Sequence, residues 1–220
     1  MSRTMSSVAI NLDGTEALLL PERAVFLGSA RALVVADVHE RRSESSRPDE
    51  EALDRLGRAA MRAGARVIVV LGDLTRELDE LDEAELERVE RFRERIALPI
   101  RLVARHAQSM VGRTLPPEWR VDAVGARFAL GGVRFAYEPP VVEQAPAAHW
   151  TLAVSPESFR SVPHERSDTP AFVVDRARRI LVLPAFSRFA PGVRFASRAG
   201  VEVFTVEDST VIDPQGQGVA

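Results

Sequence analysis

Short apolar runs alternate with amphipathic segments along the first half of the chain. Apolar residues recur at helical spacing after Pro48, which predicts a helix that ends at Gly64. A second apolar stripe, set among Glu and Arg, predicts a helix over 83–96. The order strand, helix, strand favours parallel strands joined by right-handed crossovers. The three apolar runs, each the length of a buried strand, are 32–35, 67–71 and 100–103.

The second half of the chain predicts β-hairpins. There, pairs of apolar strands flank polar or glycine turns. At the start of the first half, an opening hairpin is also expected around Pro21. We therefore expect two sheets packed face to face with helices outside, in a single domain over 1–214 followed by a frayed tail over 215–220. The strands expected in this half are a hairpin over 126–136, a strand over 150–154, and the pairs 171–174 with 180–183 and 201–206 with 211–213.

Composition limits which side chains could bind a metal ion and bears on where the protein is located. The chain has 220 residues, a formal net charge of −3 and no cysteine, and all 29 of its basic residues other than histidine are arginines. Without thiolates, a metal ion has to bind His, carboxylate or amide groups. The net charge gives no overall basic footprint for nucleic-acid binding. No apolar stretch approaches the roughly 20 residues of a membrane span, so we expect a cytoplasmic protein with no membrane partner.

Residues suited to metal chemistry follow each of the three apolar runs. Asp37 and His39 come after the first run, Asp73 comes after the second, and Arg105 with His106 comes after the third. Because the carboxyl ends of parallel strands meet at one edge of a sheet, we expect these side chains to converge. An extended backbone would also point Asp37 and His39 to the same side. Either aspartate alone is more often a turn or cap residue, but the whole set favours a site for Mn²⁺, Fe or Zn²⁺.

These motifs resemble those of the calcineurin-like metallophosphoesterases. More narrowly, they are similar to the bacterial DNA ligase-associated branch of that family, which is linked to the DNA-damage response. The resemblance covers nearly the whole chain and implies the family's α/β fold, an αββα four-layer sandwich of two mixed sheets. The segments that carry it are 19–24, 34–39, 69–73, Tyr137-Glu138-Pro139, and 183–189 with Gly192.

The resemblance implies a site for two metal ions, of which this chain keeps only part. Asp37 and His39 would hold the first ion, and Asp73 would bridge the two. Glu157 stands where the first ion has its fourth ligand, and His106 matches the family's candidate proton donor to the leaving group. The expected ligands of the second ion are replaced by Arg105, Tyr137 and Ser155. A guanidinium cannot bind a cation, so this second ion should be absent.

Three functions from different classes follow from this pattern. The first is a pseudoenzyme that acts as a binding or scaffold protein related to DNA-repair phosphoesterases. The second is a weak one-metal phosphoesterase in which Arg105 clamps a phosphate and His106 is the acid. The third is a full nuclease or phosphodiesterase whose ligands align differently. The cofactor is accordingly one divalent transition metal ion or none. The partners implied are a phosphoester or nucleic-acid substrate and a DNA-repair ligase or helicase.

Overall fold

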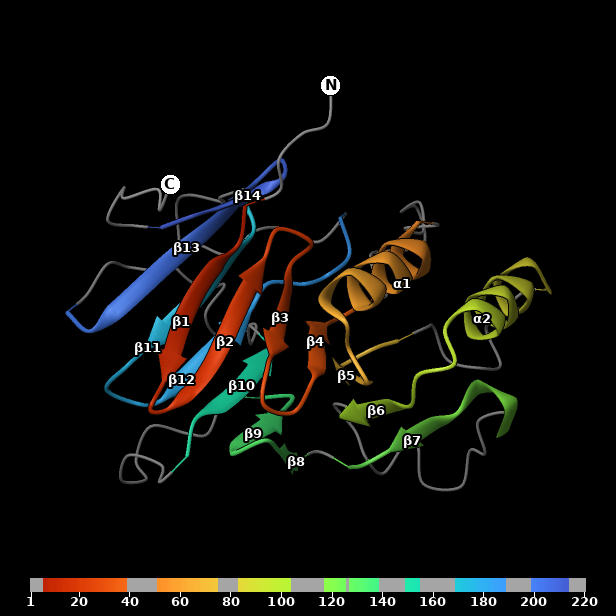
Figure 1. The fold of residues 1–220 in the computed structure, drawn as a ribbon, viewed down its shortest axis with the longest axis horizontal. Helices are drawn as coiled ribbons and strands as arrows, with labels where there is room; N and C mark the ends of the chain where they lie inside the picture. The colour runs from red at the N-terminus through yellow and green to blue at the C-terminus, as the bar shows by residue number, and fades with distance from the viewer. Residues whose placement is uncertain are drawn as a thin grey trace.

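Two seven-stranded sheets form the body of the part of the protein that the structure describes. The computed structural model describes residues 6–38, 51–74, 83–103, 117–125, 127–138, 149–154, 169–188 and 199–213. The two sheets pack face to face, with two helices beside the first sheet (Figure 1). The α/β sandwich of two mixed sheets expected from the sequence is therefore confirmed. The predicted tail over 215–220 lies outside the described residues.

The first sheet combines an antiparallel half with a parallel half. Its strands lie side by side in chain order, and the first four pair antiparallel while the last four pair parallel. Parallel neighbours need a crossover connection, and the two predicted helices lie in the connections between β4 and β5 and between β5 and β6. The strands are β1 (Val8–Leu12), β2 (Thr15–Leu20), β3 (Ala24–Leu27), β4 (Ala32–Ala36), β5 (Val67–Leu71), β6 (Ile100–Val103) and β7 (Val121–Ala123).

The second sheet comes from the second half of the chain, and its strands do not follow chain order. The spatial order is β14-β13-β11-β12-β10-β9-β8. Strand β10 lies parallel to both β9 and β12, and the remaining pairs are antiparallel hairpin or meander contacts. The strands are β8 (Arg127–Leu130), β9 (Val133–Ala136), β10 (Thr151–Val154), β11 (Ala171–Asp175), β12 (Ile180–Leu183), β13 (Val201–Glu207) and β14 (Thr210–Ile212).

Apolar side chains fill the space between the two sheets. Val34 of the first sheet and Phe135 and Phe172 of the second are fully buried in this main core. Because side chains alternate along a strand, Leu33 and Ile68 face the opposite way and pack beneath the helices. Strands β4 and β5 are therefore buried on both faces, as their continuous apolar sequences predict.

The two predicted helices cover the outer face of the first sheet. Helix α1 (Ala52–Ala63) ends at Gly64, whose left-handed φ of 64° lets its N–H bond the last carbonyls of the helix. Helix α2 (Glu83–Arg95) buries Phe92 and Val89 on one side. A short 3₁₀ turn, η2 (Pro117–Trp119), precedes β7. The described residues thus supply three of the four expected layers, and none of their helices is long and apolar enough to cross a membrane.

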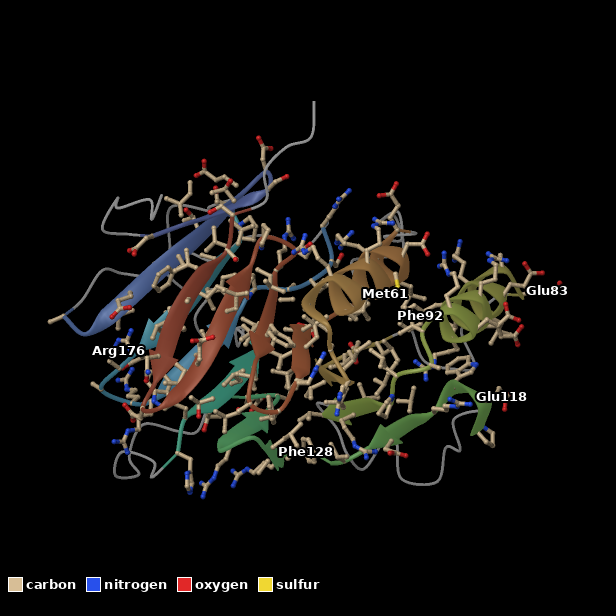
Figure 2. The ribbon with its side chains drawn as sticks, in the orientation of Figure 1. Met61, Glu83, Phe92, Glu118, Phe128 and Arg176 are labelled. Carbon is tan, nitrogen blue, oxygen red and sulfur yellow. The ribbon has the colours of Figure 1, made fainter. Side chains whose placement is uncertain are left out.

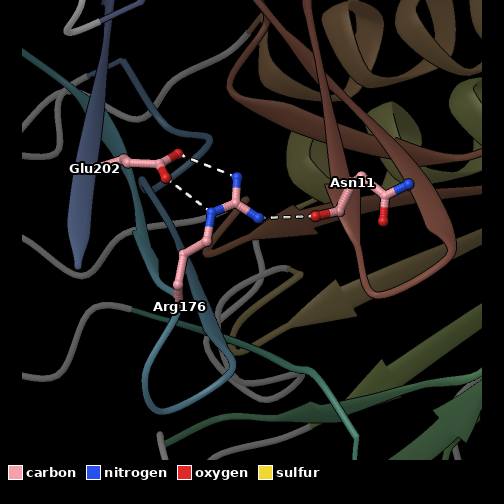
Figure 3. Close-up of polar contacts among 3 residues, drawn as sticks. All are labelled: Asn11, Arg176 and Glu202. Carbon is pink, nitrogen blue, oxygen red and sulfur yellow. Dashed lines mark hydrogen bonds and ion pairs between the residues drawn. The ribbon is translucent and has the colours of Figure 1, made fainter.

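Arg176 ties the two sheets together at one edge of the sandwich. Its Nε and Nη2 donate to the two carboxylate oxygens of Glu202 on β13, at 2.7 and 3.2 Å. Its Nη1 donates to the carbonyl oxygen of Asn11 on β1, at 2.9 Å (Figure 3). The hydrogen bond to Glu202 raises the pKa of Arg176, so the group stays charged. The Arg176 side chain is 42% exposed, so solvent screens much of this attraction.

We expect a small but measurable coupling between Arg176 and Glu202. A double-mutant cycle with Arg176→Ala and Glu202→Ala, followed by urea unfolding, should give about 0.2–1 kcal/mol, because the pair is partly exposed. The matched control is the Arg91–Glu87 pair on α2, which is more exposed and is joined through a single guanidinium nitrogen at 3.0 Å. A coupling no larger than that of the control pair would contradict the bidentate geometry as a source of stability.

Candidate functional site

The ends of β4, β5 and β6 are joined stepwise by backbone hydrogen bonds. The N–H of Asp37 donates to the carbonyl of Leu71 at 2.8 Å, and the N–H of Gly72 donates to the carbonyl of Val103 at 2.9 Å. The N–H of Asp73 lies 3.4 Å from Oδ1 of Asp37, which accepts from it. The structure therefore brings Asp37 and Asp73 together at the carboxyl edge of the first sheet, where ligands collect in α/β proteins.

Gly72 permits this close approach. Its φ is +90°, a conformation that residues with a Cβ rarely adopt. A Cβ at this position would overlap Oδ1 of Asp37 and would lie 2.9 Å from Cε2 of Tyr137. The Asp37 carboxylate and the Tyr137 ring therefore both rest against the bare face of the glycine.

Tyr137 brings the second sheet to the same place. It follows β9, and its carbonyl accepts the N–H of Val154 at the end of β10, at 3.2 Å. The half-buried ring approaches Gly72 on the first sheet. The resemblance to the metallophosphoesterases put Tyr137 at the position of a metal-binding histidine, and the structure does place it beside Asp37. The group that approaches the glycine is an aromatic carbon.

Asp37 has a different conformation from the one we expected. Its φ is +42°, so β4 ends at Ala36 and the backbone turns out of the strand. The assumption of an extended backbone through Asp37, which placed its side chain on the same side as that of His39, is therefore wrong at Asp37. The turn lets the Asp37 N–H bond β5 while its carbonyl accepts the N–H of Ser187 at 3.2 Å. Asp37 is 9% exposed, whereas Asp73 is exposed to solvent.

A segment after β12 supports Asp37 from the other side. Ala185 forms a β-bridge with Ala36, and the N–H of Phe186 donates to the carbonyl of Ala36 at 2.6 Å. Two arginines donate to backbone carbonyls of this segment. Nη2 of Arg55 donates to the carbonyl of Phe186 at 2.7 Å, and Nη1 of Arg23 donates to the carbonyl of Ser187 at 2.5 Å.

The supporting role of Arg55 was not predicted from the sequence. The guanidinium carbon of Arg55 also lies 4.6 Å from the centroid of the Phe186 ring, a cation–π contact in a buried setting. A signal was present in the helix pattern. Arg55 falls between Ala52 and Ala59 on the buried stripe of α1, where a solvated arginine would not be expected.

The remaining predicted site residues lie outside the described residues. These are His39, Arg105, His106 and Glu157. Within the described residues, no group of three or more His, Cys, Asp and Glu side chains could hold a metal ion. Asp37 and Asp73 supply two carboxylates, which is fewer than the four ligands of a tetrahedral site or the six of an octahedral one. The described residues alone are therefore consistent with part of a metal site and do not complete one.

The architecture is that of a metallophosphoesterase-like fold, with candidate residues at the strand ends of both sheets. The chain is similar in structure to a nuclease, MPE, from Pseudomonas putida, with a TM-score of 0.72 and 24% sequence identity. The match covers 94% of this chain and 98% of the nuclease chain. No protein-family model and no curated protein matches the sequence. The structural likeness establishes the fold.

We expect Gly72→Ala to destabilise the protein more than a substitution that only strains the backbone. The new Cβ would force Asp37 or Tyr137 to move in addition to the backbone cost of about 1–3 kcal/mol. Gly14→Ala is the matched control, because Gly14 has a φ of +97° and a Cβ added there would meet nothing within 4 Å. Urea unfolding measures both free energies. Equal losses of stability in the two variants would show that the approach of Asp37 and Tyr137 to Gly72 contributes nothing.

Proposed function

We propose that this chain is a metallophosphoesterase-like protein with a degenerate metal site, which acts as a pseudoenzyme or phosphoester-binding protein. Tyr137 carries the proposal. Its ring rests against Gly72 and lies beside Asp37, where the family resemblance calls for a metal-binding nitrogen. Tyr137 offers a phenol oxygen in place of an imidazole nitrogen, which is the better ligand for Mn²⁺, Fe or Zn²⁺. Together with Arg105 and Ser155, it would leave the second ion without its ligand set.

A one-metal phosphoesterase is the second candidate, and the pairing of the two aspartates favours it. Oδ1 of Asp37 reaches the backbone of Asp73, so two carboxylates remain near one another at the strand ends. His39 and Glu157 would complete a single site for Mn²⁺, Fe or Zn²⁺. A bound ion would polarise a phosphoryl oxygen. Around it, Arg105 would hold the phosphate and His106 would protonate the leaving oxygen.

The substrate class follows from the same proposal. The similar structure from Pseudomonas putida is named as a nuclease, which supports a nucleic-acid phosphoester as the ligand of this site. A DNA-repair ligase or helicase as partner and a cytoplasmic location remain proposals that rest on the sequence alone. Both candidate functions place the phosphoester at the carboxyl edge of the first sheet, beside Asp37 and Asp73.

Metal binding separates the candidate functions. We expect the purified protein to hold at most one divalent ion per chain by elemental analysis, because the ligands of the second ion are replaced. Any rise in melting temperature with Mn²⁺ should disappear in Asp37→Asn, since a ligand that binds only the folded state stabilises by mass action. Asp122→Asn, which removes an exposed carboxylate from β7, should keep the rise. No rise in any form supports the pseudoenzyme, and two bound ions would contradict the proposal.

Turnover gives an independent test of the missing second ion. With bis(p-nitrophenyl) phosphate and Mn²⁺, we expect the protein to show little activity above an Asp37→Asn/Asp73→Asn variant, because two-metal hydrolysis needs both ions to clamp the attacking and leaving oxygens. Arg105→Asn alone should not restore activity, since Tyr137 and Ser155 still supply no ligand nitrogens. Robust hydrolysis by the unmodified protein would favour the full nuclease with a different ligand alignment.

A further inference from the structure

Three exposed arginines line the edge of the first sheet that lies opposite the candidate site. Arg31, Arg66 and Arg120 each directly precede a strand of the parallel half, namely β4, β5 and β7. The N–H of Arg66 donates to the carbonyl of Arg31 at 2.7 Å, so these two are neighbours. The carbonyl of Arg120 accepts the N–H of Ile100 at 3.2 Å, which places Arg120 level with the start of β6. We call this set, together with Arg93, the arginine edge.

Arg93 adds a further positive charge beneath the surface. It lies in the last turn of α2 and is 7% exposed, and its Nη2 donates to the carbonyl of Leu98 at 2.8 Å. Among the described residues, its buried Nε and Nη1 have no hydrogen-bond partner. Burial and the positive charge of Arg120 lower the pKa of Arg93. Two guanidinium groups therefore face the same small region, and each donates to the loop between α2 and β6.

The arginine edge differs from other arginines of the first sheet and its helices, which pair with carboxylates. Arg62 pairs with Glu22, Arg95 with Asp54, and Arg101 with Asp122. In the part of the chain that the structure describes, no carboxylate pairs with any member of the arginine edge. Glu118, labelled in Figure 2, is exposed and belongs to η2 just before β7. Arg31 uses its Nε and Nη2 on the carbonyl of Gly64, so its charge is hydrogen-bonded but not neutralised.

We propose that the arginine edge binds the phosphate backbone of a single-stranded nucleic acid. Neighbouring strands lie about 4.8 Å apart, so a row that crosses from β4 to β7 is roughly 14 Å long. This length is greater than that of a single phosphate group. A linear row of cations fits a linear chain of phosphates, and guanidinium groups bind phosphate oxygens through paired N–H donors. Trp119, the aromatic residue next to Arg120, is buried and offers no stacking surface. The contact is therefore to the backbone and independent of base sequence.

This surface is separate from the candidate site at Asp37 and Asp73. Strands β4, β5 and β6 run for four or five residues between the two edges. At about 3.3 Å per residue, the two sites are some 15 Å apart. Binding at the arginine edge thus needs neither the aspartates nor a metal ion. The proposal goes beyond the proposed function and does not depend on it.

Salt-dependent binding of a labelled oligothymidylate of about 16 nucleotides tests the proposal. Fluorescence anisotropy gives the dissociation constant at several salt concentrations. For single strands, the slope of log K against log salt falls by about 0.7 for each phosphate that is no longer bound, so Arg66→Gln/Arg120→Gln should reduce it by about 1.4. Arg66→Lys/Arg120→Lys should keep the slope. Arg127→Gln/Arg134→Gln, which removes two exposed positive charges from β8 and β9, should bind like the wild type.

Each other outcome overturns the proposal. Absence of binding at low salt would mean that the arginine edge does not bind nucleic acid. Equal weakening in the two Gln variants would leave only a general charge effect. Loss of binding in Asp37→Asn/Asp73→Asn, with Arg66→Gln/Arg120→Gln unchanged, would place the nucleic acid at the candidate site. Displacement of the oligonucleotide by polyglutamate of equal charge and comparable affinity would indicate an acidic protein partner. Melting curves of all variants establish that each compared form is folded.

Discussion

The site depends on the contact between the Asp37 carboxylate and the backbone of Gly72. This contact requires a residue without a Cβ at position 72 and a left-handed turn at both positions. It also leaves one open face, which the second sheet fills with Tyr137. The second sheet therefore contributes the side chain that lies against the same glycine as Asp37.

The order of elements was predictable because most of it follows local patterns. Apolar runs marked β4, β5 and β6, and the αL glycine after α1 marked its end. Strands β1 and β7 were not predicted. The first is an edge strand whose outward residues are exposed, and the second has only three residues, two of them exposed. The order of strands in the second sheet depends on pairing between distant segments, for which a single sequence carries little signal.

The candidate site was predictable in its location and less so in its geometry. The rule that ligands gather at the carboxyl ends of parallel strands placed Asp37 and Asp73 correctly beside each other. It carried no information about φ at Asp37, because tertiary contacts to Leu71 and Ser187 impose that turn. The carbonyls that Arg23 and Arg55 bind could not be predicted from the sequence, since each lies more than a hundred residues away.

Those two arginines have a consequence for the way the protein acquires its site. Arg23 bonds the carbonyl of Ser187 across 164 positions of sequence, and Arg55 bonds that of Phe186 across 131. Closing loops of this size costs entropy before the contact returns any stability, so such contacts form late in folding. The turn at Asp37 accepts its hydrogen bond from the same distant segment. During synthesis, the amino-terminal sheet would therefore emerge with its aspartates unsupported until the chain beyond β12 has been made.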